Sequence, residues 1–107
     1  MKATENGAAA MKTLDEIIRQ LRQVQPDLRR RYPIRALGVV GSYVRGEQTE
    51  GSDVDILVDL DDGIGLMELA GLRHDLSDTL GLKVDLIMKD ALKRGIGQRI
   101  LSEAVML

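Results

Sequence analysis

The sequence contains no cysteine, phenylalanine or tryptophan, and only two tyrosines and one histidine. Without cysteine the chain cannot form a disulfide, a zinc–thiolate site or a thiol nucleophile. The lone His74 cannot build a histidine-rich metal site. With Tyr32 and Tyr43 as its only aromatic residues, the chain lacks the aromatic clusters on which single-stranded nucleic acids stack. Its core must therefore consist of Leu, Ile, Val and Met.

An excess of positive charge is also missing. Lys and Arg number 15 against 17 Asp and Glu, for a net charge of −2, so no basic field indicates nucleic acid binding. No apolar run approaches the length of a membrane span and the N-terminus lacks a signal-peptide core, so we expect a cytoplasmic protein.

The length of 107 residues indicates one domain with one core. We expect residues 1–12 to be disordered and residues 13–107 to form that domain. An enzyme of this size has no room for a separate substrate-binding domain, so its acceptor is small or is brought by a partner.

Hydrophobic periodicity predicts a small mixed sheet with helices packed on one side of it, an α/β or α+β fold. A helix is predicted from about Leu14 to Arg31. A capping box at Thr13 marks its start, and Pro33 ends it. The other expected elements are strands over 34–40, 53–60 and 83–88, a short helical turn over 43–45, and helices over 66–80 and about 91–102. The tail 103–107 is a candidate edge strand or partner-docking segment.

Two carboxylates interrupt the second predicted strand. Asp53 and Asp55 are two residues apart, so their side chains share a face. At 4 Å and a surface-like dielectric they would repel by roughly 4 kcal/mol, which a bound Mg²⁺ would reverse. Asp85 interrupts the next strand, and would join them if the two strands are neighbours. Three such carboxylates can hold two metal ions, the arrangement used for phosphoryl and nucleotidyl transfer.

Each of these patterns alone is weak. An isolated Asp-x-Asp is more often a solvated strand edge than a metal site, and Asp59, Asp61 and Asp62 are expected to be surface acids of this kind. Gly41-Ser42 alone is a loop dipeptide. However, it follows a strand, where glycine permits a close backbone approach and free N–H groups can cradle a phosphate.

The combination is specific. Gly41-Ser42, ten residues and then Asp53-x-Asp55 resembles the motif of the DNA polymerase β-type nucleotidyltransferase superfamily. Gly-Ser-x-x-Arg-Gly followed by Ser-Asp-x-Asp-x-x-Val is similar to the minimal nucleotidyltransferase (MNT) family. The stretches "GLKVDLIMKDAL" and "RILSEAVML" extend the resemblance over about residues 14 to 107.

The resemblance implies a role for each matching residue. Gly41 and Ser42 would hold the β- and γ-phosphates of a nucleoside triphosphate. Asp53 and Asp55 would ligate two Mg²⁺ ions, and Asp85 would ligate the catalytic one and help activate the attacking hydroxyl.

For the other polar residues a structural interpretation stands beside a functional one. Arg45 matches the family's arginine, and either helps to hold the triphosphate or braces the loop on an acid. Ser52 is expected to organise the turn before Asp53. His74 is expected on the surface or at an interface rather than in catalysis. Residues 29–31, three arginines, suit a solvated helix end better than a phosphate or partner patch.

The family resemblance also implies a partner. MNT proteins pair with HEPN-domain RNase toxins in toxin–antitoxin modules, which implies an antitoxin that transfers AMP from ATP to a tyrosine of the toxin. Two alternatives remain open: an antitoxin that neutralises the toxin by binding alone, and a nucleotidyltransferase with a small-molecule acceptor. Candidate partner surfaces are Lys93, Arg94, Arg99 and the C-terminal tail.

Overall fold

The computed structural model describes residues 12–61, 64–92 and 97–107. Its helices are α1 (Leu14–Arg31), α2 (Ser42–Arg45), α3 (Leu66–Leu80), the 3₁₀ helix η2 (Lys89–Leu92) and α4 (Gly97–Glu103). Its strands are β2 (Ile34–Val40), β3 (Val54–Leu60), β4 (Val84–Met88) and β5 (Val105–Met106). The expected disorder over 1–12 falls almost wholly outside the described residues, as do Asp62, Lys93 and Arg94.

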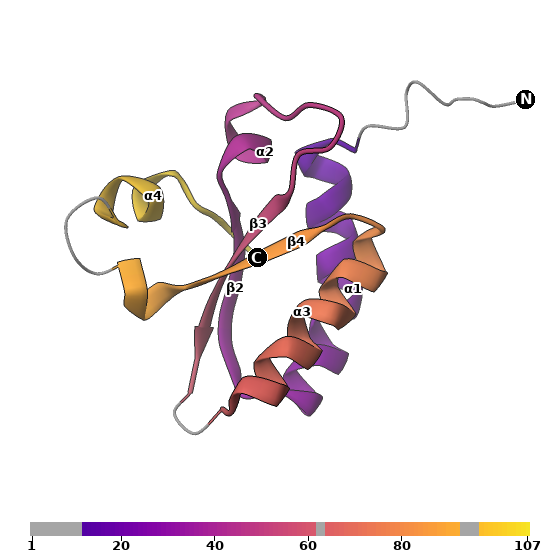
Figure 1. Cartoon of the computed structure of the whole chain (residues 1–107), viewed down its shortest axis with the longest axis vertical. Coiled ribbons are helices and arrows are strands. Elements are labelled where there is room, and N and C mark those ends of the chain that lie inside the picture. The colour runs from indigo at the N-terminus through magenta and orange to yellow at the C-terminus, as the bar shows by residue number, and fades with distance from the viewer. Residues whose placement is uncertain (1–11, 62–63, 93–96) are drawn as a thin grey trace, which may run out of the picture.

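The four strands form one mixed sheet in the order β4-β3-β2-β5 (Figure 1). β2 pairs antiparallel with both β3 and β5, while β3 pairs parallel with β4. The mixed sheet with packed helices confirms the predicted fold class, and the expected adjacency of the strands that carry Asp55 and Asp85 is confirmed.

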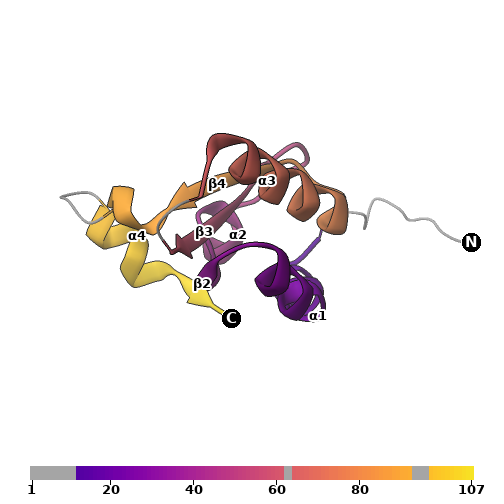
Figure 2. The same cartoon turned by 90° about the horizontal axis from the view of Figure 1, so that it is seen from below.

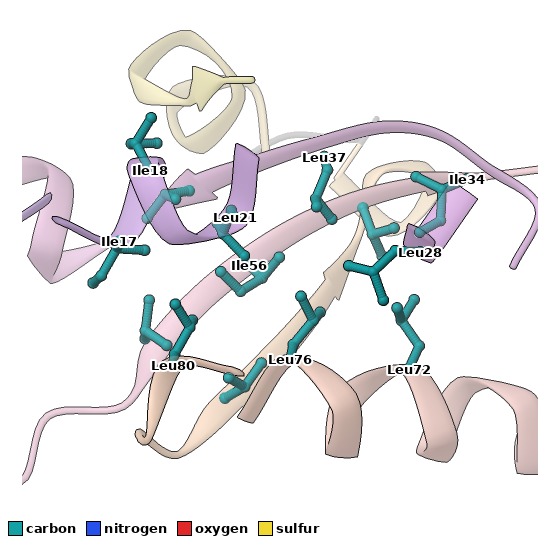
Figure 3. Packing of buried hydrophobic residues seen from close by; sticks show 14 of the residues in the cluster. Ile17, Ile18, Leu21, Leu28, Ile34, Leu37, Ile56, Leu72, Leu76 and Leu80 are labelled. Carbon is teal, nitrogen blue, oxygen red and sulfur yellow. The ribbon is translucent and has the colours of Figure 1, made fainter. Parts of the chain in front are cut away.

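Helices α1 and α3 cover one face of the sheet, and α4 lies on the other side of it (Figure 1, Figure 2). The sequence suggested that all helices pack on one side of the sheet, and α4 departs from this expectation. The core lies between α1, α3 and the sheet (Figure 3), and its labelled members are Ile17, Ile18, Leu21, Leu28, Ile34, Leu37, Ile56, Leu72, Leu76 and Leu80. As expected, it is aliphatic apart from Tyr43.

Local sequence explains where α1 and α3 begin and end. The Thr13 hydroxyl accepts a hydrogen bond from the Glu16 amide (3.2 Å), and the Glu16 carboxylate accepts one from the Thr13 amide (3.0 Å). This capping box satisfies two amides that have no partner inside the helix. α3 ends at Gly81, whose φ of 66° suits a glycine cap.

The helix predicted over about 91–102 is confirmed only in part. The chain forms the 3₁₀ helix η2 (Lys89–Leu92) and the α-helix α4 (Gly97–Glu103), and residues 93–96 lie outside the described residues. A Cβ on Gly97 would lie 1.8 Å from the Leu92 carbonyl oxygen. The chain therefore makes a close approach that only glycine permits, and α4 starts there. The tail forms β5, which confirms the edge-strand alternative.

Within the part of the chain that the structure describes, no helix is both long enough and apolar enough to cross a membrane.

Candidate active site

The strand register brings the predicted site residues together around Asp55. In the antiparallel pair, Val40 of β2 lies opposite Asp55 of β3. In the parallel pair on the other side, Asp85 of β4 lies opposite Asp55. Asp55 is therefore flanked by the strand that leads into Gly41-Ser42 and by the strand that carries the third acid.

Gly41 lies directly against the Asp55 carboxylate. Its φ of 82° and ψ of −150° belong to a region that side chains disfavour. A Cβ at this position would lie 2.2 Å from Asp55 Oδ2 and 3.1 Å from its Cγ. Only a glycine can bring the backbone so close to this acid.

The backbone after Gly41 turns at once into α2. The amides of Val44 and Arg45 both donate to the Gly41 carbonyl, at 3.1 and 3.2 Å. The amides of Ser42 and Tyr43 are the first of the helix and have no acceptor within it. They and the half-buried Ser42 hydroxyl are available to a phosphate beside Asp55.

The three acids act on one another electrostatically. The pKa of Asp55 is raised, first by burial and then by the negative charges of Asp85 and Asp53, while Arg45 opposes the rise. A half-buried carboxylate with two acidic neighbours is a poor arrangement for stability unless a cation binds there.

The donor set fits a hard divalent cation. Carboxylate oxygens are the ligands that Mg²⁺ prefers. Asp55 and Asp85 on paired strands, with Asp53 directly before β3, supply them. However, within residues 12–61, 64–92 and 97–107 no group of three or more His, Cys, Asp or Glu side chains is arranged to hold a metal ion. Carboxylates that repel one another are expected to point apart until a cation draws them together. Asp53, Asp55 and Asp85 stay the predicted Mg²⁺ ligands.

Arg45 forms ion pairs with Glu47 (2.8 Å) and Glu103 (3.5 Å), so it braces α2 against the following loop and the end of α4. The alternative role, holding a triphosphate, stays a prediction. Ser52 organises the turn as expected, since its hydroxyl accepts from the Thr49 amide at 2.8 Å.

The remaining polar candidates lie where a structural role predicts. Arg30 and Arg31 form ion pairs with Asp27 near the end of α1, and Arg29 donates to the Ile34 carbonyl. His74 is exposed on α3.

Sequence reasoning missed Tyr43, whose side chain is 3% exposed. Burial, and then the charge of Asp53, raise its pKa. Tyr43 belongs to the core directly beneath the turn that begins α2. The only signal in the sequence was an aromatic residue directly after Gly41-Ser42.

Comparison with known proteins agrees with this geometry. Residues 21–107 match the model of the nucleotidyltransferase domain family. The chain is 49% identical over 96 residues to protein adenylyltransferase MntA of Thermococcus cleftensis, covering 90% of this chain and 97% of that protein. A solved minimal nucleotidyltransferase superposes with a TM-score of 0.74 and 31% identity, covering 90% of this chain and 97% of the other.

A further structure shows the fold alone. A chain in the complex of a tri-AMPylated Shewanella oneidensis HEPN toxin with an MNT antitoxin superposes with a TM-score of 0.58 at 19% identity, covering 84% of this chain and 70% of the other.

The fold and site therefore define a nucleotidyltransferase. The chain belongs to the nucleotidyltransferase domain family, and the expected resemblance to minimal nucleotidyltransferases is confirmed.

Proposed function

We propose that the chain transfers AMP from ATP to a tyrosine hydroxyl of a HEPN-domain toxin and acts as its antitoxin. The observation that carries the proposal is the placement of Asp55 between Asp85 and the Gly41 backbone. That arrangement supports the proposal, because the turn proposed to bind phosphate lies beside acids proposed to bind metal, as nucleotidyl transfer requires.

Each candidate active-site residue has a role that follows from its position. Gly41 and the first amides of α2 hold the β- and γ-phosphates, and the Ser42 hydroxyl adds a donor. The acceptor hydroxyl attacks the α-phosphorus while the bond to the bridging oxygen breaks and pyrophosphate leaves. Asp85 orients that hydroxyl and helps to draw off its proton. Mg²⁺ held by Asp53, Asp55 and Asp85 would lower the pKa of the hydroxyl and neutralise charge on the pyrophosphate.

The choice of acceptor is supported by the relatives. A protein 49% identical to this chain is named a protein adenylyltransferase, and a similar fold occurs in a complex with a tri-AMPylated HEPN toxin.

The position of the label tests the reaction. The full chain and the HEPN protein encoded beside it would be incubated with Mg²⁺ and ATP labelled in the α- or the γ-phosphate. We expect the α-label on the HEPN protein and no γ-label. Asp53→Asn should abolish labelling, whereas Asp78→Asn, an exposed acid of α3, should not.

Neutralisation of the toxin distinguishes catalysis from occlusion. If Asp53→Asn binds the HEPN protein and silences its RNase activity as well as wild type does, binding alone is sufficient and catalysis is not the antitoxin mechanism. Labelling of a small molecule instead of the protein would contradict the proposed acceptor.

A further inference from the structure

A groove runs between α3 and the strand at the edge of the sheet. A hollow of about 270 Å³ is lined by Leu66, Leu69, Ala70, Arg73, Asp85 and Leu86. A second hollow of about 230 Å³ is lined by Arg73 together with His74, Ser77, Lys83 and Val84. The two hollows meet at Arg73, and together they form what we call the α3–β4 groove.

One end of the α3–β4 groove is apolar and open to solvent. Leu66 and Met67, at the start of α3, are 86% and 89% exposed. Leu69 and Leu86 are only partly buried against the core. The core buries Leu72, Leu76 and Leu80 of the same helix completely, so the apolar residues of α3 extend further than folding requires. This surplus indicates a contact with another molecule.

The other end is basic. Arg73 and Lys83 form no salt bridge with any residue in the described ranges, although the chain carries more acids than bases. Two such cations beside His74 are complementary to an acidic side chain of a partner.

The floor of the groove is an edge strand. β4 is the last strand in the sheet order, so the backbone groups on its outer side have no strand partner in the described residues. An extended peptide can pair with such an edge while its side chains enter the neighbouring hollows.

Asp85 connects the α3–β4 groove to the active site. It lines the apolar hollow, and in the sheet it lies opposite Asp55. Because its neighbours Val84 and Leu86 pack against the core, the Asp85 side chain lies on the other face of β4. A segment paired with the edge of β4 therefore presents alternate side chains to the hollows and to Asp85.

We propose that the α3–β4 groove docks the acceptor protein. The occupant is an extended segment with an aliphatic side chain at the Leu66 end and an acidic side chain at the Arg73 and Lys83 end, and it delivers its hydroxyl to Asp85. This inference rests on the proposed function. A protein is favoured over a nucleic acid because half of the groove is apolar and the chain has no net positive charge.

Charge reversal in the α3–β4 groove tests the docking. Affinity for the purified full-length HEPN partner would be measured for wild type, Arg73→Glu and Leu66→Glu, together with KM for the partner and KM for ATP. Both positions are exposed, so the fold should tolerate the changes. We expect binding to weaken, and KM for the partner to rise, by about tenfold or more, with KM for ATP unchanged.

The matched control is Arg22→Glu, which makes the same charge change at an exposed arginine of α1 that also lacks a salt bridge in the described part of the chain. It should bind the partner as wild type does. Equal losses in Arg73→Glu and Arg22→Glu would point to a long-range charge effect and overturn the docking site.

The outcomes separate the two proposals. If wild type labels the partner and the groove variants bind it within about twofold of wild type, the groove is not the docking site and the proposed function stands. If wild type binds the partner through the groove without labelling it, the docking site stands and the transfer fails. A groove variant that changes only the self-association of the chain, or its RNA binding, would also overturn the inference.

Discussion

At the scale of single residues, Asp55 shows how the demands of the site oppose those of folding. It is half buried, has two acidic neighbours and lies against the Gly41 backbone. Burial and these charges raise its pKa, so in the absence of a cation the ionised side chain destabilises the folded state.

Replacing this acid should therefore stabilise the metal-free protein and abolish its activity. Because the folded-state pKa of Asp55 lies above the unfolded value of about 3.9, its favourable contribution is complete below that pH and is lost as the pH rises through the folded-state pKa. At pH 7 in EDTA we expect Asp55→Asn to melt at a higher temperature than wild type. Transfer of AMP should fall by more than about 100-fold, because loss of even the groups that orient a metal ligand commonly costs 10- to 100-fold.

The control for this variant is Asp78→Asn, which removes an exposed acid of α3. It should change neither the melting temperature at pH 7 nor the transfer of AMP. A lower melting temperature for Asp55→Asn in EDTA would contradict the electrostatic account of the site.

Gly41 gives a second prediction at this scale. Gly41→Ala adds a Cβ 2.2 Å from the Asp55 carboxylate at a backbone φ of 82°. Something must shift, so we expect a loss of about 2 kcal/mol or more in the free energy of unfolding and a loss of ATP binding. Urea denaturation and nucleotide titration would measure the two effects.

Gly46→Ala separates the clash from backbone strain. Gly46 also has a positive φ, 71°, but a Cβ there would meet nothing within 4 Å. Gly46→Ala should therefore cost about 1 kcal/mol from strain alone and leave ATP binding intact. Equal effects of the two substitutions would show that the approach to Asp55 has no special role.

The sequence predicted the site at this scale only in part. The spacing of Asp53 and Asp55 shows that they share a strand face. The contact between Gly41 and Asp55, however, depends on the register of two strands, in which Val40 lies opposite Asp55. The ion pair of Arg45 with Glu103 joins residues 58 apart in the chain, and no local pattern marks it.

At the scale of elements, a polar contact joins the end of α1 to α3. The Tyr32 hydroxyl donates to Asp75 at 2.7 Å, and Arg31 donates to the same oxygen at 2.6 Å. The hydrogen bond from Tyr32, followed by the contact with Arg31, lowers the pKa of Asp75 although partial burial opposes this. These contacts connect the two helices that cover the sheet, and they do not involve the candidate active-site residues.

Tyr32→Phe should weaken that tie without affecting catalysis. The lost hydrogen bond should lower the free energy of unfolding by about 1 kcal/mol, measured by urea denaturation at pH 7. Because the folded-state pKa of Asp75 is lowered, the contribution of its carboxylate is present above about pH 3.9 and is lost as the pH falls through the folded-state pKa. The difference between wild type and variant should therefore shrink in acid.

Arg30→Gln is the control for the helix tie, because it removes an exposed ion pair with Asp27 on α1 alone. Exposed ion pairs contribute little to stability. The free energy of unfolding of Arg30→Gln should therefore match that of wild type at pH 7 and in acid. A pH-independent difference between Tyr32→Phe and wild type would show that Asp75 is not the group involved.

Elements with strong periodicity and clear caps were predicted well. α1 begins and ends where the capping box and Pro33 indicated, and α3 ends at Gly81 as expected. The last helix was predicted less well. Gly97, at the start of α4, lies close to the Leu92 carbonyl, and hydrophobic spacing in the sequence does not show such a contact. The exposure of Leu66 was also missed, since periodicity places an apolar residue on a helix face but does not show where the core ends.

At the scale of the whole molecule, one sheet is covered on one face by two helices (Figure 1). Asp55 of this sheet lies beside Gly41 and opposite Asp85. The described residues share a single core. In the proposed reaction, the surface around Asp85 is where the acceptor is oriented.

The most direct test of the central claim is the intact mass of the HEPN partner after incubation with this chain, ATP and Mg²⁺. We predict a gain of whole AMP units that disappears with Asp53→Asn and with EDTA. An unchanged mass with wild-type chain, under conditions where the two proteins form a stable complex, would contradict the account.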